Sequence, residues 1–349
     1  MAFLLYGANG YTGRLIAELA VSRGMKPILA GRSEAKVRPL ADRLGLEWRA
    51  FSLSDPKALD EGLRGADAVL HSAGPFSRTS APMLDACLRG KRHYLDLTGE
   101  IDVFEATFTR DAEAKAAGVT LISGVGFDVV PSDCLAALLA RALPSAKTLE
   151  IAFAATGGAA SSAGTMKSSV EGLAKGGRAR RGGKLIEVPL GSESKQIAFA
   201  DKTRHCVAIP WGDLSTAFRS TGIPDITVFM AMPKSAALAT KAMRLFRPLL
   251  QSERLVSFIQ ARIEKTVTGP TAEERKRYGV VFWGRVTDGD RAVLGSMTVP
   301  EGYTFTAESA LQATLRVLEG KAPAGALTPS QAFTADFAAT LPGVTVKVG

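Results

Sequence analysis

The chain has 349 residues, of which 46% are hydrophobic, so it is long for one domain and comfortable for two. Its 43 basic and 34 acidic residues give a net charge of +9, which is compatible with nucleic acid, an anionic membrane surface or an anionic small molecule. The three cysteines, Cys87, Cys134 and Cys206, form no CxxC pair and have no histidine cluster nearby, which argues against a disulfide framework and a metal site and favours a reducing cytoplasm.

The first 126 residues alternate between short apolar runs and helical patterns. Strands are expected over residues 3–8, 26–32, 46–53, 67–74, 92–99 and 119–126. Helical patterns over 13–24, 35–45, 56–65, 80–90 and 104–118 separate them and end in glycine, where a helix cap takes positive φ. Strands that alternate with helices of this size pair in parallel, so we expect an α/β fold with a doubly wound parallel sheet of the Rossmann type.

After residue 143 the pattern changes and predicts a second domain. Strand-like runs over 147–155, 183–191, 195–201, 205–212 and 225–232 are separated by few helices, which suits a mainly antiparallel sheet. A helical stretch over 236–264, interrupted at 247–250, follows, and then a hairpin over 275–300 that turns at 288–290. A helix over 306–320 closes the pattern. No signal peptide and no apolar stretch of about 18 residues is visible, so we expect no integral membrane association.

The stretch "GANGYTG" over residues 7–13 follows the first expected strand and starts a helix. Its three glycines are three residues apart, one residue longer in the first interval than G-x-G-x-x-G. They permit a tight turn, close approach of backbone N–H groups to a pyrophosphate, and close packing of helix on strand. The stretch therefore predicts a dinucleotide site, with these candidate contacts: Gly7, Asn9, Gly10, Tyr11, Thr12 and Gly13.

The end of the second strand predicts which dinucleotide binds. NAD sites usually place an acidic side chain there for the ribose 2′-hydroxyl, whereas a basic side chain accommodates the 2′-phosphate of NADP. Arg32 and Ser33 stand at this position, and Glu34 is the nearest acid. We therefore expect NADP, although an arginine that merely ends the strand would leave NAD open.

Two further turns are candidate cofactor contacts. Small residues after the fourth strand would let the chain pass beneath the ribose and nicotinamide, which nominates Ser72, Ala73, Gly74 and Pro75 against the alternative of a purely structural turn. Asp55 follows the third strand and could face the adenine, but an N-cap of the next helix explains it at least as well.

Five segments, in this order and spacing, resemble the saccharopine dehydrogenase-like oxidoreductases. They are "GANGYTGR", "LAGR", "SAGPF", "YLDLTGE" (94–100) and "GFDVVPSD" (126–133), with a weaker echo in "GYTFTAESALQATLRVLEG" and "LTPSQAF" near the C-terminus. The most similar branch is the bacterial one that includes the trans-acting enoyl reductases of lipid biosynthesis. The resemblance covers about the first 135 residues.

The resemblance implies an NADP-linked oxidoreductase and a homodimer. It implies a dinucleotide-binding domain over 1–130 with 304–349 packed back on it, and an inserted α+β domain over 131–303 for substrate binding and dimerisation. It carries over no defined catalytic residue, and the arginine pattern that binds substrate in true saccharopine enzymes is absent.

Catalytic candidates come from the strand ends, because ligands bind at the carboxyl edge of open α/β sheets. Asp128, after the sixth strand, is the first choice for a polar group near the nicotinamide. Asp96, after the fifth, is the second, and Tyr303 could line a cleft between the domains. Fixing turns and capping helices is the competing interpretation of both aspartates.

The chemistry expected is hydride transfer to or from a carbonyl, imine or enoyl group of a small or lipid-like substrate. The competing hypothesis is a sensor or scaffold that binds NADP without turnover, since no catalytic dyad or Tyr-x-x-x-Lys motif is present. The basic cluster "GGRARRGGK" over 176–184 is interpreted as a solvated loop, with a contact to a phosphate or carboxylate as the alternative. The lack of interleaved aromatic residues disfavours nucleic acid.

Overall fold

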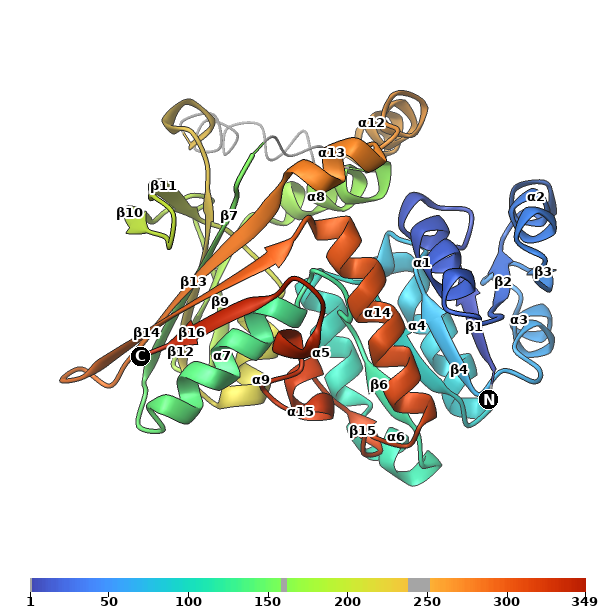
Figure 1. Cartoon of the computed structure of the whole chain (residues 1–349), viewed down its shortest axis with the longest axis horizontal. Coiled ribbons are helices and arrows are strands. Elements are labelled where there is room, and N and C mark those ends of the chain that lie inside the picture. Colours follow the sequence, from blue (N-terminus) through green and yellow to red (C-terminus); the bar gives the residue numbers. More distant parts are fainter. Residues whose placement is uncertain (1, 158–161, 238–251) are drawn as a thin grey trace. The chain divides into compact units, whose positions relative to one another are not determined.

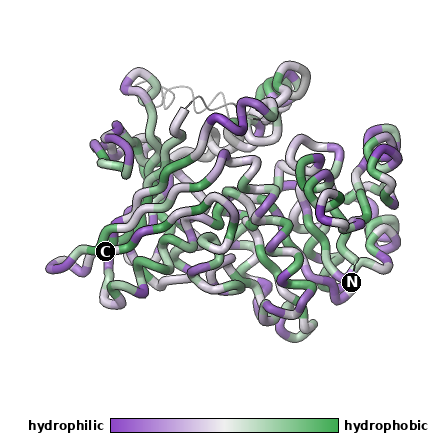
Figure 2. The backbone as a smooth tube through the Cα atoms, in the orientation of Figure 1, coloured by the Kyte–Doolittle hydropathy of each residue, from purple (hydrophilic) through white to green (hydrophobic). Residues whose placement is uncertain are grey.

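The computed structural model describes residues 2–157, 162–237 and 252–349 (Figure 1). The chain divides into two compact units. Unit 1 comprises the residues up to Val130 together with Tyr303–Thr334, and unit 2 comprises Pro131–Gly302 and Ala335–Gly349. In Figure 2 the strands inside each unit are mostly hydrophobic, whereas the hydrophilic stretches lie mostly on outer helices and turns.

Unit 1 contains a sheet of seven strands in the order β15-β6-β5-β4-β1-β2-β3. Every pair in it is parallel. The strands are β1 (Phe3–Tyr6), β2 (Ile28–Gly31), β3 (Trp48–Ala50), β4 (Ala68–His71), β5 (His93–Asp96), β6 (Thr120–Ile122) and β15 (Gly325–Ala326). The six strands expected from the sequence all form, and the predicted doubly wound parallel sheet is confirmed. The two-residue β15 was not predicted, because pairing with β6 rather than a hydrophobic pattern defines it.

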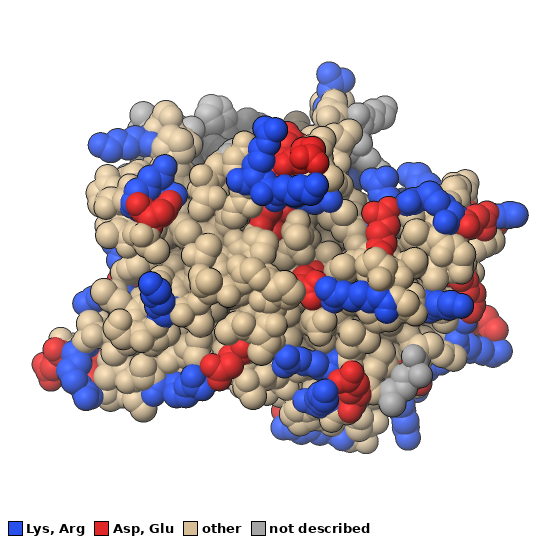
Figure 3. All heavy atoms as spheres, in the orientation of Figure 1, with Lys and Arg blue, Asp and Glu red and all other residues tan. Residues whose placement is uncertain are grey.

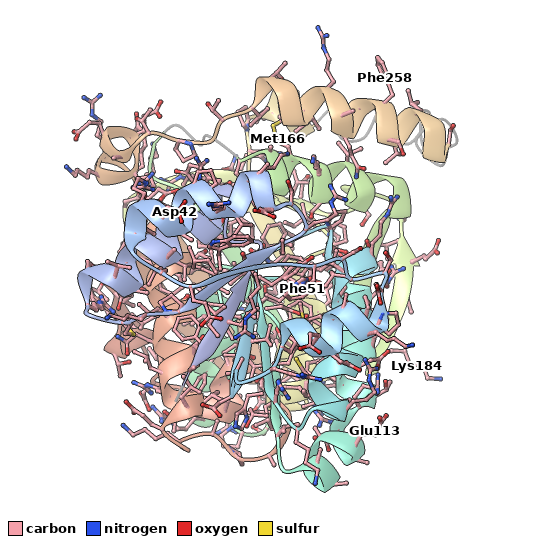
Figure 4. All side chains as sticks on the ribbon, turned by 90° about the vertical axis from the view of Figure 1, so that its right-hand side faces the viewer. Asp42, Phe51, Glu113, Met166, Lys184 and Phe258 are labelled. Atoms are coloured by element: carbon pink, nitrogen blue, oxygen red, sulfur yellow. The ribbon has the colours of Figure 1, made fainter. Side chains whose placement is uncertain are left out.

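The helices of unit 1 follow the strands as expected. They are α1 (Tyr11–Ser22), α2 (Glu34–Leu44), α3 (Pro56–Gly62), α4 (Phe76–Arg89), α5 (Ile101–Thr109), α6 (Asp111–Ala117), α14 (Gly302–Leu318) and α15 (Pro329–Phe333). The single helix expected over 104–118 is two helices, because Arg110 ends α5 and precedes α6. Buried side chains from β1, β2, β4 and β5 join residues of α3 and α4 in one core, which also includes Phe51 (Figure 4).

The strand order places the topological switch point between β1 and β4. The chain moves outward from β1 to β2 and β3, and then crosses to β4 and continues to β5 and β6. At such a point the loops after the two central strands diverge and leave a crevice at the carboxyl edge of the sheet. The glycine loop follows β1, so the fold puts it at this edge.

Unit 2 contains a mixed sheet of nine strands among its described residues. The order is β10-β11-β12-β7-β13-β14-β16, and β8 pairs with β12 and β9. The strands are β7 (Thr148–Ala155), β8 (Gly177–Arg181), β9 (Lys184–Val188), β10 (Ser194–Ala198), β11 (Thr203–Ala208), β12 (Asp225–Ala231), β13 (Gly279–Thr287), β14 (Ala292–Pro300) and β16 (Thr345–Val348). The sheet is mainly antiparallel as expected, and only β7 and β12 pair in parallel.

The helices of unit 2 are α7 (Val130–Ala142), α8 (Ala163–Lys175), α9 (Asp213–Thr221), α12 (Glu253–Thr266) and α13 (Ala272–Arg277). Of the helical stretch expected over 236–264, residues 238–251, with the interruption at 247–250, lie outside the described residues. No helix among the described residues is both long enough and apolar enough to cross a membrane.

The C-terminal segment divides between the two units. The sequence analysis assigned 304–349 to the dinucleotide-binding domain, whereas in the structure Tyr303–Thr334 belong to unit 1 and Ala335–Gly349 to unit 2. The reason is β16, which pairs antiparallel with β14 and so belongs to the second sheet.

The basic cluster over 176–184 is a hairpin and not a loop. β8 and β9 pair antiparallel around Gly182 and Gly183, which both have positive φ. Arg180 is only 4% exposed, donates to the Gly183 carbonyl at 2.7 Å and stacks over Phe218. Lys184, next to the turn, is the one exposed charge of the cluster (Figure 4). On the face seen in Figure 3, basic and acidic side chains are interspersed. The expectation of a solvated loop was therefore wrong, because the segment pairs as a hairpin in which Arg180 is buried and Arg178 and Arg181 are half-buried.

Candidate functional site

The glycine loop is a tight turn that only glycine allows at two of its positions. Gly7 has φ +85°, and a Cβ there would lie 2.8 Å from the Ala73 backbone nitrogen. A Cβ on Gly13 would lie 2.4 Å from the Gly7 carbonyl oxygen. The N–H groups of Gly7 and Ala8 both donate to the Ala30 carbonyl, which ties the loop to the end of β2. The loop is thus held close against β2 and the β4–α4 turn.

The N-terminus of α1 is open to an anion. Gly10 is its N-cap, and no side chain caps the helix in the described structure. The first-turn N–H groups of a helix need partners from outside the helix, and the helix dipole favours a negative charge there. A pyrophosphate group fits this arrangement.

The N-terminus of α4 differs, because it is already occupied by a carboxylate. The two oxygens of Glu100 accept the N–H groups of Phe76 at 2.9 Å and Ser77 at 2.8 Å. Of the two helix starts on either side of the switch point, the structure therefore leaves α1 for the phosphates.

Cationic side chains without partners lie just after β2. Arg32 and Lys36 are exposed, and neither side chain forms an ion pair or hydrogen bond with any described residue. Arg38 on the same helix is instead paired with Glu34 at 3.3 Å and Asp42 at 3.5 Å. Arg32 therefore has its guanidinium available for a phosphate at the position that the sequence analysis assigned to it.

Other predicted cofactor contacts surround this position. Asn9 places its Oδ1 against Gly31 at the end of β2, 3.0 Å from where a Cβ would stand. Ser33 is the half-buried N-cap of α2, and its side chain forms no capping bond. Asp55 caps α3 by accepting the N–H groups of Lys57 and Ala58 at 3.0 and 3.1 Å, which is the alternative that the sequence left open. Its contact with adenine stays a prediction.

The turn after β4 lies directly against the glycine loop. The Ser72 N–H and hydroxyl both donate to the Tyr6 carbonyl, at 2.8 and 2.9 Å, and Gly74 is exposed. His71 at the strand end is fully buried, with Nε2 3.0 Å from the Thr79 hydroxyl. Burial lowers the pKa of His71 to about 3, so it remains neutral at physiological pH and does not provide an acid.

Asp96 is a buried carboxylate with four donors. It receives the Tyr94 and Ser123 hydroxyls on Oδ2, at 2.8 and 2.9 Å, and the N–H groups of Thr98 and Gly124 on Oδ1, at 3.0 and 2.9 Å. Burial raises its pKa to about 6, and the four donors oppose that rise. These bonds hold together the loops after β5 and β6.

Asp128 has the opposite environment. The residue is half-buried, yet its Oδ1 is inaccessible to water and has no hydrogen-bond partner among the described residues. A Cβ on Gly99 would lie 2.6 Å from its Oδ2, so the carboxyl group is packed against that glycine. Burial alone raises the pKa of Asp128 to about 7. A carboxyl group of this kind holds a proton at neutral pH and can donate it.

Tyr303 lies at the glycine loop. Its ring packs edge-on against Tyr11, with the ring centroids 4.9 Å apart. It stands in the first turn of α14, so a segment about 290 residues away in sequence contacts the start of α1. The cleft-lining role of Tyr303 stays a prediction.

Unit 1 therefore brings most of the predicted residues to one edge of its sheet. The loops after β1, β2, β4, β5 and β6 all leave from the carboxyl edge, because the strands are parallel. Thr306 and Ser309 of α14, which bind the turn that carries Asp128, were not predicted from the sequence. Tyr303, Thr306 and Ser309 are hydroxyl side chains spaced three residues apart, and this spacing could have indicated them. Among the described residues no group of three or more acids, histidines or cysteines could hold a metal ion.

Comparisons with known proteins agree with this geometry. Residues 3–122 match the family model described as the saccharopine dehydrogenase NADP-binding domain. A "trans-acting enoyl reductase" of Mycobacterium leprae is 38% identical over 143 residues, which is 37% of this chain and 33% of the relative. A "trans-acting enoyl reductase" of Mycobacterium ulcerans is 32% identical over 143 residues, which is again 37% of this chain and 33% of the relative. The matched part thus spans about a third of the length of these relatives.

A solved structure shows the same fold over the whole chain. The apo saccharopine dehydrogenase (L-Glu forming) of Saccharomyces cerevisiae has a TM-score of 0.69 and 13% identity, and the match covers 100% of this chain and 99% of that chain. At this identity the likeness concerns the fold alone. The resemblance noted from sequence motifs is confirmed: residues 3–122 are similar to the saccharopine dehydrogenase NADP-binding domain, and NADP is the cofactor that this match supports.

Proposed function

We propose that this protein is an NADP-dependent reductase that transfers a hydride to a carbonyl, imine or enoyl group of a small or lipid-like substrate. The observation that carries the proposal is Asp128, a carboxyl group with a raised pKa whose Oδ1 has no partner among the described residues, on the same strand edge as the glycine loop. Perturbed acids beside a cofactor site are typical of catalytic groups.

The residues of unit 1 have defined parts in holding the cofactor. The open N-terminus of α1 and its glycines receive the pyrophosphate, and Arg32 with Ser33 binds the 2′-phosphate. The turn over Ser72–Pro75 supports the ribose and nicotinamide. NADPH, when bound, supplies the hydride.

Asp128 acts as the proton donor in this proposal. Addition of a hydride to an electrophilic carbon places an electron pair on the oxygen or nitrogen of the polarised group, or on the α-carbon of an enoyl thioester. The Asp128 carboxyl group gives its proton to that atom and is reprotonated from water. Asp96 orients the loop beside it, and Tyr303 bounds the site near Tyr11.

The class of substrate rests on two kinds of support. The names of the mycobacterial relatives support an enoyl group, and the sequence motifs that resemble the saccharopine dehydrogenase-like oxidoreductases support a carbonyl or an imine. Both reactions need the same pairing of a hydride with one proton, which is the chemistry that Asp128 and NADPH can provide.

Cofactor preference tests the assignment of Arg32. Fluorescence titration should give NADPH a clear advantage over NADH, and Arg32→Ala should weaken NADPH about tenfold or more while leaving NADH unchanged, because a charge-assisted contact to phosphate is lost. Arg38→Ala is the matched control, since that arginine is already paired with Glu34 and Asp42 and should change neither affinity. Equal affinities in the wild-type protein would contradict the assignment.

Turnover tests the reductase against the alternative of a sensor or scaffold. NADPH oxidation should be measured with crotonyl-CoA, a ketone and a cyclic imine as acceptors. We expect turnover of at least one acceptor, with a rate that falls as pH rises above about 7, because Asp128 must be protonated to donate. Asp128→Asn should lose about 10²-fold or more in kcat and keep its affinity for NADPH. Binding of NADPH with no turnover of any acceptor would favour the sensor.

We further propose a cytoplasmic homodimer. The support is the resemblance to the family and the three cysteines, all of which are buried thiols outside any disulfide and suit a reducing compartment. Light scattering behind a size-exclusion column should give about twice the mass of one chain, and a monomer at micromolar concentration would contradict the dimer.

A further inference from the structure

Helix α14 contacts both functional segments of unit 1 through three side chains at a spacing of three, which we call the hydroxyl row: Tyr303, Thr306 and Ser309. Tyr303 packs on Tyr11 of the glycine loop. The other two members bind the turn over residues 125–128, which carries Asp128. The row thus connects the start of α1 to the turn after β6.

Thr306 makes the contact nearest to Asp128. Its Oγ1 accepts the Phe127 N–H at 3.0 Å, and this N–H belongs to the residue that directly precedes Asp128. A Cβ on Gly126 would lie 2.8 Å from the Thr306 methyl group, so the turn is packed on this side chain as well as bonded to it. Thr306 is 8% exposed, so water cannot easily replace its hydroxyl as the acceptor.

Ser309 holds the other end of the same turn. Its hydroxyl is fully buried and donates to the Val125 carbonyl at 2.8 Å. With Thr306 on one side and Ser309 on the other, the backbone from Val125 to Phe127 has little freedom. The Asp128 carboxyl group is thereby held with Oδ2 against Gly99 and with Oδ1 buried and without a hydrogen-bond partner among the described residues.

We infer that Thr306 is a positioning residue, which keeps Oδ1 of Asp128 buried and without a hydrogen-bond donor by binding the preceding peptide. This inference rests on the proposed role of Asp128 and adds a residue of the C-terminal segment to that site. Without the acceptor, the Phe127 N–H must turn toward water or toward the carboxyl group itself. In either case the Asp128 carboxylate gains a hydrogen-bond donor, from the N–H group or from water, and this donor favours its ionised form.

Burial is the only cause of the raised pKa of Asp128, to which no charged group contributes. The loop packed against it carries Asp96 and Glu100, and both carboxylates are bound by two backbone N–H groups each. Tyr303 and Glu308 are the titratable groups on the nearby part of α14, and Glu308 is paired with Arg23. The backbone bond to Thr306 is therefore the contact to change.

The test measures the pKa of Asp128 directly, by carboxyl carbon NMR of protein labelled at aspartate. The signal that disappears in Asp128→Asn belongs to Asp128. We expect a wild-type pKa of about 7 and a fall of about one unit or more in Thr306→Val, which keeps the shape and removes the hydroxyl. Thr306→Ser, which keeps the hydroxyl, should restore the wild-type value. Should Thr306→Val not fold, Thr306→Ala removes the same hydroxyl without adding volume.

Kinetics give a second readout. Thr306→Val should lower kcat about tenfold with crotonyl-CoA or whichever acceptor is turned over, shift the alkaline limb of the pH profile downward, and leave the KM for NADPH unchanged. In an Asp128→Asn background the same substitution should have no further effect, since it acts through that carboxyl group. A folded Thr306→Val protein with unchanged Asp128 pKa and unchanged kcat overturns the inference. Full turnover by Asp128→Asn overturns the proposed function instead, and the NMR measurement still reports on Thr306, because it needs no substrate.

Discussion

Two buried acids stand at the same strand edge of unit 1 in opposite environments. Asp96 has four hydrogen-bond donors, whereas Oδ1 of Asp128 has none among the described residues. Burial raises the pKa of both, to about 6 for Asp96 and about 7 for Asp128. Donors stabilise the ionised form, so Asp96 suits a structural part and Asp128 suits a proton donor.

The raised pKa of Asp128 predicts a pH-dependent cost to folding. Its folded-state pKa of about 7 lies above the usual value of 3.8, so between these values the folded state binds the proton more tightly and stability falls as pH rises. Asp128→Asn removes this cost. We expect the variant to match the wild type near pH 4 and to exceed it by about 2 kcal/mol at pH 8.

Urea unfolding at the two pH values measures the difference. Asp85→Asn is a suitable control, since Asp85 is a surface acid paired with Arg110 and should show no gain at pH 8. A wild-type protein more stable than Asp128→Asn at pH 8 would contradict the assigned environment of this carboxyl group.

At the scale of elements, the glycine loop depends on close packing between α1 and β1. The Gly13 Cα faces the Gly7 carbonyl, and a backbone oxygen cannot move aside as a flexible side chain could. Gly13→Ala should therefore destabilise the protein by about 1–3 kcal/mol and lower the affinity for NADPH, because α1 must shift away from the strand.

Denaturant unfolding and NADPH titration check this expectation, with Gly172→Ala as control. Gly172 lies within α8 and has open space where a Cβ would stand. Alanine there should be neutral or stabilising by up to about 1 kcal/mol, since alanine is the better helix former. Equal stability of the two variants would mean that the loop relaxes more easily than its contacts imply.

Element types in unit 1 were predictable because each follows from local pattern. All six main strands and the helices between them form where apolar runs and glycine caps indicated them. In unit 2 a strand was expected over 183–191, where β9 forms, but β8 was missed, since its arginines and glycines resemble a solvated loop. Its burial comes from pairing with β12 and from the contact of Arg180 with Phe218, neither of which is local in sequence.

At the scale of the whole molecule, cofactor binding should protect one unit selectively. A ligand that binds the native state stabilises the part that it contacts, by about 2.7 kcal/mol at one hundred times its Kd. Under saturating NADP⁺ we expect slower amide exchange in the first turn of α1 and over residues 31–37. The β8–β9 hairpin of unit 2 should be unchanged and serves as the internal control.

Hydrogen exchange with mass detection makes this measurement. NAD⁺ at the same concentration should give weaker protection over 31–37, where the 2′-phosphate is proposed to bind. Equal protection by the two cofactors would contradict the assignment of Arg32, and protection confined to unit 2 would contradict the site itself.

The sequence by itself determined the dinucleotide-binding domain and its cofactor class. Glycine spacing, strand–helix alternation and the basic residue after the second strand are local features, and each has a direct physical meaning for a phosphate or a backbone turn. Asp128 could be nominated for the same reason, since it follows a strand at the carboxyl edge.

Only the tertiary structure decided what surrounds these residues. In the folded chain, Oδ1 of Asp128 has no donor among the described residues, whereas Asp96 accepts four hydrogen bonds and Glu100 binds the N-terminal N–H groups of α4. Thr306 binds the turn that carries Asp128, and β16 pairs in the second sheet. Such contacts join residues from about 20 to 180 positions apart. Burial and hydrogen bonding depend on which segments meet, and no local pattern specifies that meeting.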